Sequence, residues 1–163
     1  MKAKTIVYTS NTGFTARYAE ARGERTGLPV MDLKTAVRDL PHGTPIVFFG
    51  WLCAGAVNGF KKAADLFAIS AVCPVGMAPE APQVTSPLEA SYPAVFYLRG
   101  GYDYRKLTGI YKAMMWAMTQ VMAKRAKKPG AAPETRDMAA ALKAGGDWVD
   151  LTALGPIADY LAD

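Results

Sequence analysis

Residues 5–20 read TIVYTSNTGFTARYAE, and this stretch does most to decide the fold. It begins with a short run of apolar and β-branched residues that predicts a buried strand. A helical pattern starts at Phe14 and stops before Gly27, a residue type that commonly ends helices. Between strand and helix lies a polar turn built around Gly13. A strand, a polar turn and a helix in this order are typical of an α/β fold.

Four more short apolar runs predict strands. Their apolar residues are continuous rather than alternating, which is typical of strands buried on both faces of a parallel sheet. These runs are residues 28–33, 45–50, 69–77 and 93–98. Helical patterns separate the strands, so βαβ units with right-handed crossovers are expected. The sequence therefore predicts a three-layer α/β sandwich, formed by residues 1–163 as a single domain.

Further helices are predicted after the third strand. Asn58 is placed to cap a helix whose apolar residues fall on one side. The longest helical pattern covers residues 107–123, and Pro156 fits the first turn of a last helix that ends near Leu161. Between the second and third strands only about one helical turn fits. Residues 127–147 are rich in Ala, Gly and Pro, and we interpret them as an excursion with a short helix at 135–143.

The composition is that of an ordinary globular domain, with 51% hydrophobic and 20% charged residues among 163. No secretory leader pattern opens the sequence, so a cytoplasmic location is expected. Cys53 and Cys73 lack the CxxC spacing of a metal or redox motif. We expect both to be reduced packing residues, and no metal site is predicted.

Positive charge is concentrated in residues 99–128, where eight basic side chains accompany one acid, Asp103. Such a segment is typical of a protein that meets an acidic ligand, an anionic membrane surface or nucleic acid, and it is equally typical of a solvated surface. Nucleic acid is disfavoured, because no helix-turn-helix, RNA-recognition or zinc-finger pattern is present. Side chains near the last predicted strand are candidates for substrate contacts: Arg99, Tyr102, Tyr104, Arg105 and Lys106.

The polar turn has the composition of a phosphate site. Its sequence is SNTGFT, formed by Ser10, Asn11, Thr12, Gly13, Phe14 and Thr15. The hydroxyl and amide side chains are neutral donors, and the glycine lets backbone N–H groups converge on one anion. Neither the dinucleotide fingerprint GxGxxG nor the P-loop GxxxxGK[ST] is present. The alternative is a turn whose side chains only cap the helix.

SNTGFT resembles the (S/T)xTGxT phosphate loop of flavodoxins. The resemblance implies a flavodoxin-like sandwich with a five-stranded parallel sheet of order 2-1-3-4-5, and it places the phosphate of FMN at residues 10–15. It also implies that two later loops, GWLCAGAV and GMAPEAP, hold the isoalloxazine ring. Their candidate residues are Trp51, Leu52, Cys53, Ala54, Gly55, Gly76 and Met77. From the residues alone, Trp51 either stacks on a flat ring or packs as a surface aromatic.

The second half resembles the menaquinone-dependent protoporphyrinogen dehydrogenase branch of this family. The resemblance is carried by YLRGGYDYRKLTGIYKAMMWAMTQVMAKRA at residues 97–126 and GDWVDLTALGPIADYLA at residues 146–162. It implies an FMN-dependent oxidoreductase of the protoporphyrinogen or quinone type. The redox partner is then a small molecule or a protein. Two alternatives are a flavodoxin-type electron carrier that serves a protein partner, and a flavin-free interaction module.

The predicted helix at residues 107–123 is apolar on almost all sides. We expect it to pack one side on the sheet, as a flavodoxin-like fold requires. Its length is marginal for a span of about 20 residues across a bilayer. The remaining apolar side chains therefore need the 127–147 excursion, a homodimer partner or a membrane surface to cover them. In the last case the protein lies peripherally on the inner face of the membrane.

Overall fold

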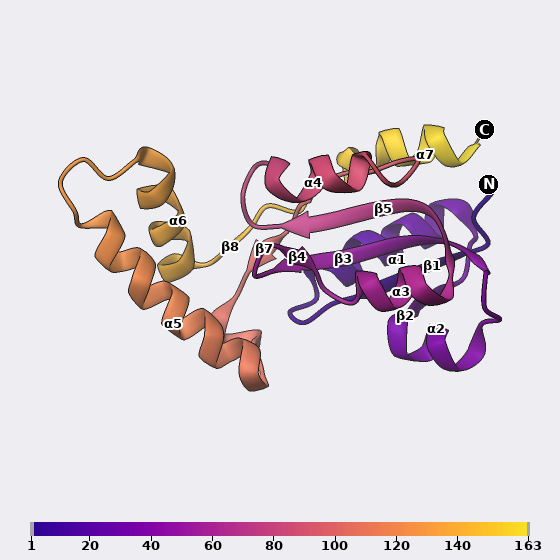
Figure 1. The fold of residues 1–163 in the computed structure, drawn as a ribbon, viewed down its shortest axis with the longest axis horizontal. Coiled ribbons are helices and arrows are strands. Elements are labelled where there is room, and N and C mark those ends of the chain that lie inside the picture. The colour runs from indigo at the N-terminus through magenta and orange to yellow at the C-terminus, as the bar shows by residue number, and fades with distance from the viewer. Residues whose placement is uncertain (1, 163) are drawn as a thin grey trace.

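A parallel sheet forms the centre of the computed structural model, which describes residues 2–162 (Figure 1). Its strand order is β2-β1-β3-β5-β6, with every neighbouring pair parallel. Counted along these five strands the order is 2-1-3-4-5, so the predicted fold class is confirmed. The bounds are β1 (Thr5–Thr9), β2 (Val30–Asp32), β3 (Pro45–Cys53), β5 (Ala68–Gly76) and β6 (Leu98–Arg99).

The two strands at the sheet edges are shorter than predicted. β2 ends at Asp32 because the Asp32 carboxylate accepts hydrogen bonds from the N–H groups of Lys34 and Thr35, and so starts the next helix. In the fifth strand only Leu98 and Arg99 form a ladder. Val95 adds an isolated bridge to Val72.

Helices cover both faces of the sheet. α1 (Phe14–Thr26) and α7 (Gly155–Ala162) pack on one face, where their buried side chains join the apolar cluster formed by one side of the strands. α2 (Leu33–Asp39), α3 (Phe60–Leu66) and α4 (Pro82–Glu89) cover the other face. Ile6, Phe48 and Val72 are completely buried between these layers. The result is the predicted three-layer sandwich.

The helices match the bounds and caps predicted from the sequence to different degrees. α1 has the predicted bounds, because Gly27 adopts a left-handed backbone with φ of 70° and its N–H donates to the carbonyl of Gly23. The prediction that Asn58 caps α3 is wrong. Gly59, with φ of 76°, occupies that position, and the Asn58 amide donates to the hydroxyl of Tyr111 instead. α2 has seven residues rather than a single turn, and α4 was not predicted.

The largest departure is a pair of helices that leaves the sheet. α5 (Gly109–Ala126) and α6 (Pro133–Ala144) pack against each other and extend from the carboxyl end of the sheet (Figure 1). The short strands β7 (Gly101–Tyr102) and β8 (Gly146–Asp147) pair antiparallel at their base. We call residues 101–147 the helical arm.

The arm corrects the prediction that residues 107–123 pack on the sheet. The face in question is occupied by α7, whose Ile157 is completely buried, together with Leu154 of the short 3-10 helix Leu151–Leu154. α5 packs on α6 instead, and no residue of α5 is fully buried. Within residues 2–162, no helix has both the length and the apolarity needed to cross a membrane.

Candidate functional site

The loop of residues 10–15 leaves the N-terminus of α1 open. Gly13 is the residue before the helix, with φ of 95°, and no side chain caps the helix there. The Gly13 N–H donates to Ser10 Oγ at 3.1 Å, and the Gly13 carbonyl accepts from the N–H of Arg17. The N–H groups of the first helical residues have no carbonyl one turn earlier to bind, as at any helix start. The sequence-based alternative of a turn that only caps its helix therefore does not describe this loop.

The same loop contains a buried threonine and one buried polar atom without a partner. Thr15 is buried beneath the loop. The Asn11 side-chain oxygen is buried and has no hydrogen-bond partner among the described residues. A buried polar atom left unpaired costs about 1–3 kcal/mol, and because this oxygen is an acceptor, an N–H or O–H donor would satisfy it and a phosphate oxygen would not.

This loop and two other segments line a cavity of about 100 Å³. They come from the carboxyl ends of β1, β3 and β5, which lie at one edge of the parallel sheet. The predicted residues that line the cavity are Ser10, Asn11, Thr12, Phe14, Thr15, Trp51, Leu52, Gly76 and Met77. Gly13 lines the adjoining cleft described below.

Three predicted residues do not line the cavity. Cys53, Ala54 and Gly55 belong to a tight hairpin between β3 and the two-residue strand β4 (Ala56–Val57). Ala54 and Gly55 both have positive φ, of 50° and 77°, as a two-residue hairpin turn requires. Partial burial raises the pKa of the Cys53 thiol, so the structure does not activate it as a nucleophile.

The base of the arm closes the cavity on its remaining side. Tyr102, Leu107 and Met115 line it there, and Val75, Gly100 and Gly101 complete the lining. The ring of Tyr111 contacts Trp51 edge-on, with 4.9 Å between the ring centroids. Tyr102 was predicted as a substrate contact. Leu107, Tyr111 and Met115 were missed as site residues, because a helix expected against the sheet could not also lie over its carboxyl edge.

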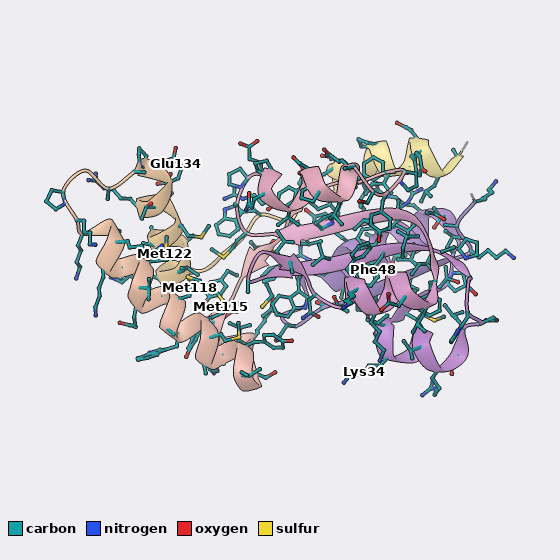
Figure 2. The ribbon with its side chains drawn as sticks, viewed as in Figure 1. Lys34, Phe48, Met115, Met118, Met122 and Glu134 are labelled. Carbon is teal, nitrogen blue, oxygen red and sulfur yellow. The ribbon has the colours of Figure 1, made fainter. Side chains whose placement is uncertain are left out.

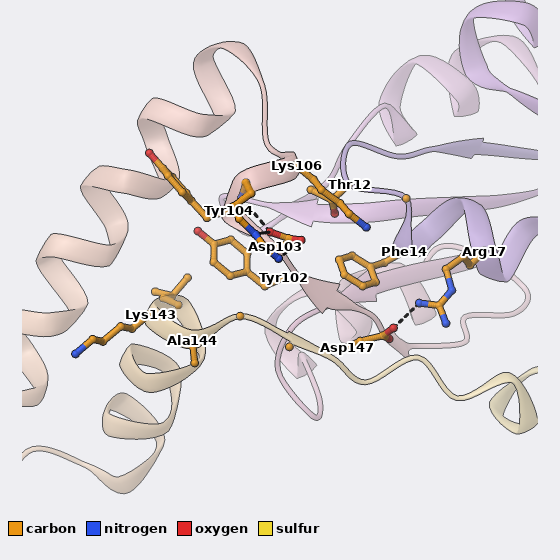
Figure 3. Close-up of a pocket in the computed structure, with 15 residues that line it drawn as sticks. Thr12, Phe14, Arg17, Tyr102, Asp103, Tyr104, Lys106, Lys143, Ala144 and Asp147 are labelled. Carbon is orange, nitrogen blue, oxygen red and sulfur yellow. Dashed lines mark hydrogen bonds and ion pairs between the residues drawn. The ribbon is translucent and has the colours of Figure 1, made fainter.

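A second cleft, of about 790 Å³, opens between α1 and the arm (Figure 3). It shares Thr12, Phe14 and Tyr102 with the smaller cavity. Arg17 and Asp147 form an ion pair of 2.6 Å across it, and Lys106 lies over the ring of Phe14, with its Nζ 5.8 Å from the centroid. The hydrogen bond from Arg17 lowers the pKa of Asp147.

This cleft is basic. Arg17, Arg105, Lys106 and Lys143 line it, together with two carboxylates that are already paired with arginines. Lys143 comes from the last turn of α6, and it lines the cleft because α6 returns the chain to the base of the arm. Among the predicted substrate residues, Arg105, Lys106, Tyr102 and Tyr104 lie here.

Arg99 has a different place. Its Nε donates to the carbonyl of Met77 at 2.9 Å, and its guanidinium stacks 4.4 Å from the Trp148 ring centroid. It therefore holds the loop after β5 rather than lining the basic cleft.

Comparison with known proteins does not assign the chain to a family. No protein-family model matches the chain, and the search of curated proteins found no match.

Proposed function

We propose that this protein is an FMN-binding, flavodoxin-like oxidoreductase. The observation that carries the proposal is the uncapped start of α1 in a loop of hydroxyl and amide side chains, next to a cavity lined by Trp51 and Met77. Helix N-termini favour anions, and the loop after the first strand of an open parallel sheet is a common place for a phosphate.

The residues present fit FMN. Ser10, Asn11, Thr12 and Thr15 would hold the phosphate together with backbone N–H groups. Trp51, Leu52, Gly76 and Met77 would contact the ring. The small cavity lies between the basic cleft and a third cleft of about 620 Å³, with which it shares Ser10, Asn11 and Trp51. Each of the two larger clefts, of about 790 and 620 Å³, by itself has the size of an ordinary cofactor site, about 300–1,000 Å³.

Each part of the site would have a separate task. FMN, when bound, supplies electron or hydride transfer. The loop would fix its position, and Tyr111 and Met115 of the arm would shield the ring region from water. The basic cleft would attract a substrate with carboxylate groups, as a porphyrinogen has, and a neutral quinone would need no such attraction. Protoporphyrinogen or quinone chemistry is therefore the reaction class we propose.

The test is a comparison of FMN with riboflavin, which lacks the phosphate. The variant Thr12→Ala/Thr15→Ala should bind FMN at least about 100-fold more weakly and riboflavin unchanged, because each of the two lost hydrogen bonds to a charged group is worth about 1.5–3 kcal/mol. Thr85→Ala/Thr135→Ala, in α4 and α6, is the matched control and should bind both as the parent protein does. Circular dichroism verifies that each variant folds.

Two results would contradict the proposal. A purified protein that shows no flavin absorption and takes up no added FMN would exclude any flavin function. Equal loss of FMN and riboflavin binding in the threonine variant would remove the phosphate assignment. Anaerobic reoxidation by quinones and turnover of protoporphyrinogen then distinguish the two reaction types.

A further inference from the structure

The outer side of α5 carries large apolar side chains that no other part of residues 2–162 covers. α6 packs on one side of α5, where Met115 and Met122 meet Met138 and Leu142. The arm lies at the end of the molecule away from the two chain ends, and α5 runs along its lower edge in the view of Figures 1 and 2. The exposed fractions on it are high: Ile110 71%, Met114 40%, Trp116 59%, Met118 47% and Val121 44%.

These side chains form a broad surface rather than a narrow seam. At about 100° per residue they cover an arc of roughly 200°, from Trp116 on one flank to Met118 on the other. Ala113 and Ala117, also exposed, lie inside the arc, and Gln120 is the exposed polar residue between positions 110 and 121. A single partner helix would cover a narrower stripe than this arc. The width of the arc therefore favours contact with the acyl chains of a lipid bilayer over contact with one helix.

The charges around the arc disfavour pairing with a second copy. α5 contains no acidic residue. Its C-terminal end carries Lys124, Arg125, Lys127 and Lys128, and the segment before its N-terminus carries Arg105 and Lys106. A parallel α5 pair would bring the C-terminal cations together, and an antiparallel pair would place them beside Arg105 and Lys106 of the other copy. Both arrangements put like charges in contact.

The acidic residues of the arm lie elsewhere. Glu134 and Asp137 of α6 line a cleft with Met77 and Arg99, on the side toward the sheet. Residues 101–147 contain nine basic and four acidic side chains, a net charge of +5, so the rest of the chain is neutral. The cations that flank α5 therefore meet no opposing charge on its outer side.

We propose that the outer side of α5 binds the surface of an anionic lipid bilayer. The helix lies in the plane of the membrane, its apolar arc enters the boundary between headgroups and acyl chains, and the flanking cations contact lipid phosphates. Trp116 suits this boundary, because its ring is apolar and its N–H is polar. The proposal is independent of the proposed flavin function.

The test is sedimentation of the full chain with lipid vesicles. Vesicles of equal parts phosphatidylcholine and phosphatidylglycerol should bind it, pure phosphatidylcholine should bind it much less, and salt should weaken the binding. Lys124→Gln/Arg125→Gln should reduce partitioning about 30-fold, since each cation near an anionic surface contributes about fivefold. Lys61→Gln/Lys62→Gln, which removes the same charge from α3, should partition as the parent does.

A second variant tests the apolar arc. Ile110→Gln/Met114→Gln/Met118→Gln should abolish binding to the mixed vesicles while circular dichroism stays unchanged. If this variant does not fold, Trp116→Phe replaces it: the parent's shift of tryptophan fluorescence to shorter wavelength on binding should then be lost. Three results would overturn the proposal: no binding to anionic vesicles, binding that both α5 variants retain, or a dimer in solution that the glutamine substitutions dissociate.

Discussion

Gly101 sets how closely the arm approaches the sandwich. A Cβ atom at this position would meet the Phe14 ring and would lie 2.6 Å from the carbonyl oxygen of Gly146. The ring can turn away, but the carbonyl belongs to the backbone of β8 and cannot. We predict that Gly101→Ala lowers the free energy of unfolding by about 1–3 kcal/mol, measured by urea denaturation.

Gly155 is the control for that substitution. It starts α7 with a helical backbone, and a Cβ atom there would meet no neighbour within 4 Å. Gly155→Ala should leave the free energy of unfolding unchanged or raise it by up to about 1 kcal/mol. No loss in Gly101→Ala would mean that β7 and β8 shift easily to make room for the Cβ atom. A similar loss in both variants would mean that the loss does not come from the close approach at Gly101.

Tyr97 predicts how the protein responds to alkaline pH. Its hydroxyl donates to the carbonyl of Ala78 at 2.6 Å, and burial raises the pKa of Tyr97 to about 12, from the ordinary value of 10.0. The folded state then favours the neutral phenol more than the unfolded state does. Its stabilising contribution is complete below pH 10 and is lost as the pH rises through about 12.

Unfolding in urea at a series of pH values measures this effect. The midpoint should fall between pH 10 and 12, and the fall should be smaller in Tyr97→Phe, which cannot ionise. Tyr92→Phe is the control, and it should keep the full pH dependence. An equally steep fall in the Tyr97 and Tyr92 variants would assign the alkaline sensitivity to other groups.

At the scale of elements, the arm is an insertion into an otherwise complete sandwich. Tyr102 and Gly146 are cross-strand partners, so a two-residue Asn-Gly turn can replace residues 103–145. We predict that the shortened chain still folds, because the sheet, α7 and the 3-10 helix before it contribute the completely buried Phe49, Ile157 and Leu154 without the arm. Near-ultraviolet circular dichroism and a cooperative urea transition verify folding.

The shortened chain should release FMN faster, since it lacks Tyr111 and Met115 over the ring region. Stopped-flow dilution of the flavin-loaded protein measures this rate. Failure of the shortened chain to fold would show that the arm is part of the folding unit. Unchanged release would show that its base does not shield the site.

The same elements show what the sequence could and could not predict. The start and end of α1 were predictable, because Gly13 and Gly27 flank it and both adopt left-handed backbone conformations. α5 was not, because a helix that is apolar on nearly all sides has no periodicity to say which side faces the sheet. α7 has a short but clear apolar side, and it packs on the sheet face where α5 was expected.

For the whole molecule, the parallel sheet explains why much of the candidate site could be predicted. Strand order and direction bring the ends of β1, β3 and β5 to one edge, so residues 10–15, Trp51 and Met77 meet there although they are far apart in sequence. Tyr111, Met115 and Lys143 come from the arm instead. Their positions depend on how α5 and α6 pack against each other, which the local sequence pattern of either helix does not predict.

The distribution of charge over the molecule predicts the preferred redox partners. The whole net charge of +5 lies on the arm, whose base lines the basic cleft beside the proposed flavin site. With anionic ferricyanide as the oxidant, the reduced, FMN-loaded protein should be reoxidised about 10-fold faster at low ionic strength than at high ionic strength. With a cationic cobalt complex as the oxidant, reoxidation should instead be slower at low ionic strength. Lys106→Gln/Lys143→Gln should flatten both salt dependences. Lys2→Gln/Lys4→Gln, which removes the same charge at the amino end of β1, should not. A rate that rises with salt for ferricyanide would mean that electrons leave by a face other than the cleft, and would favour a carrier that serves a basic protein partner.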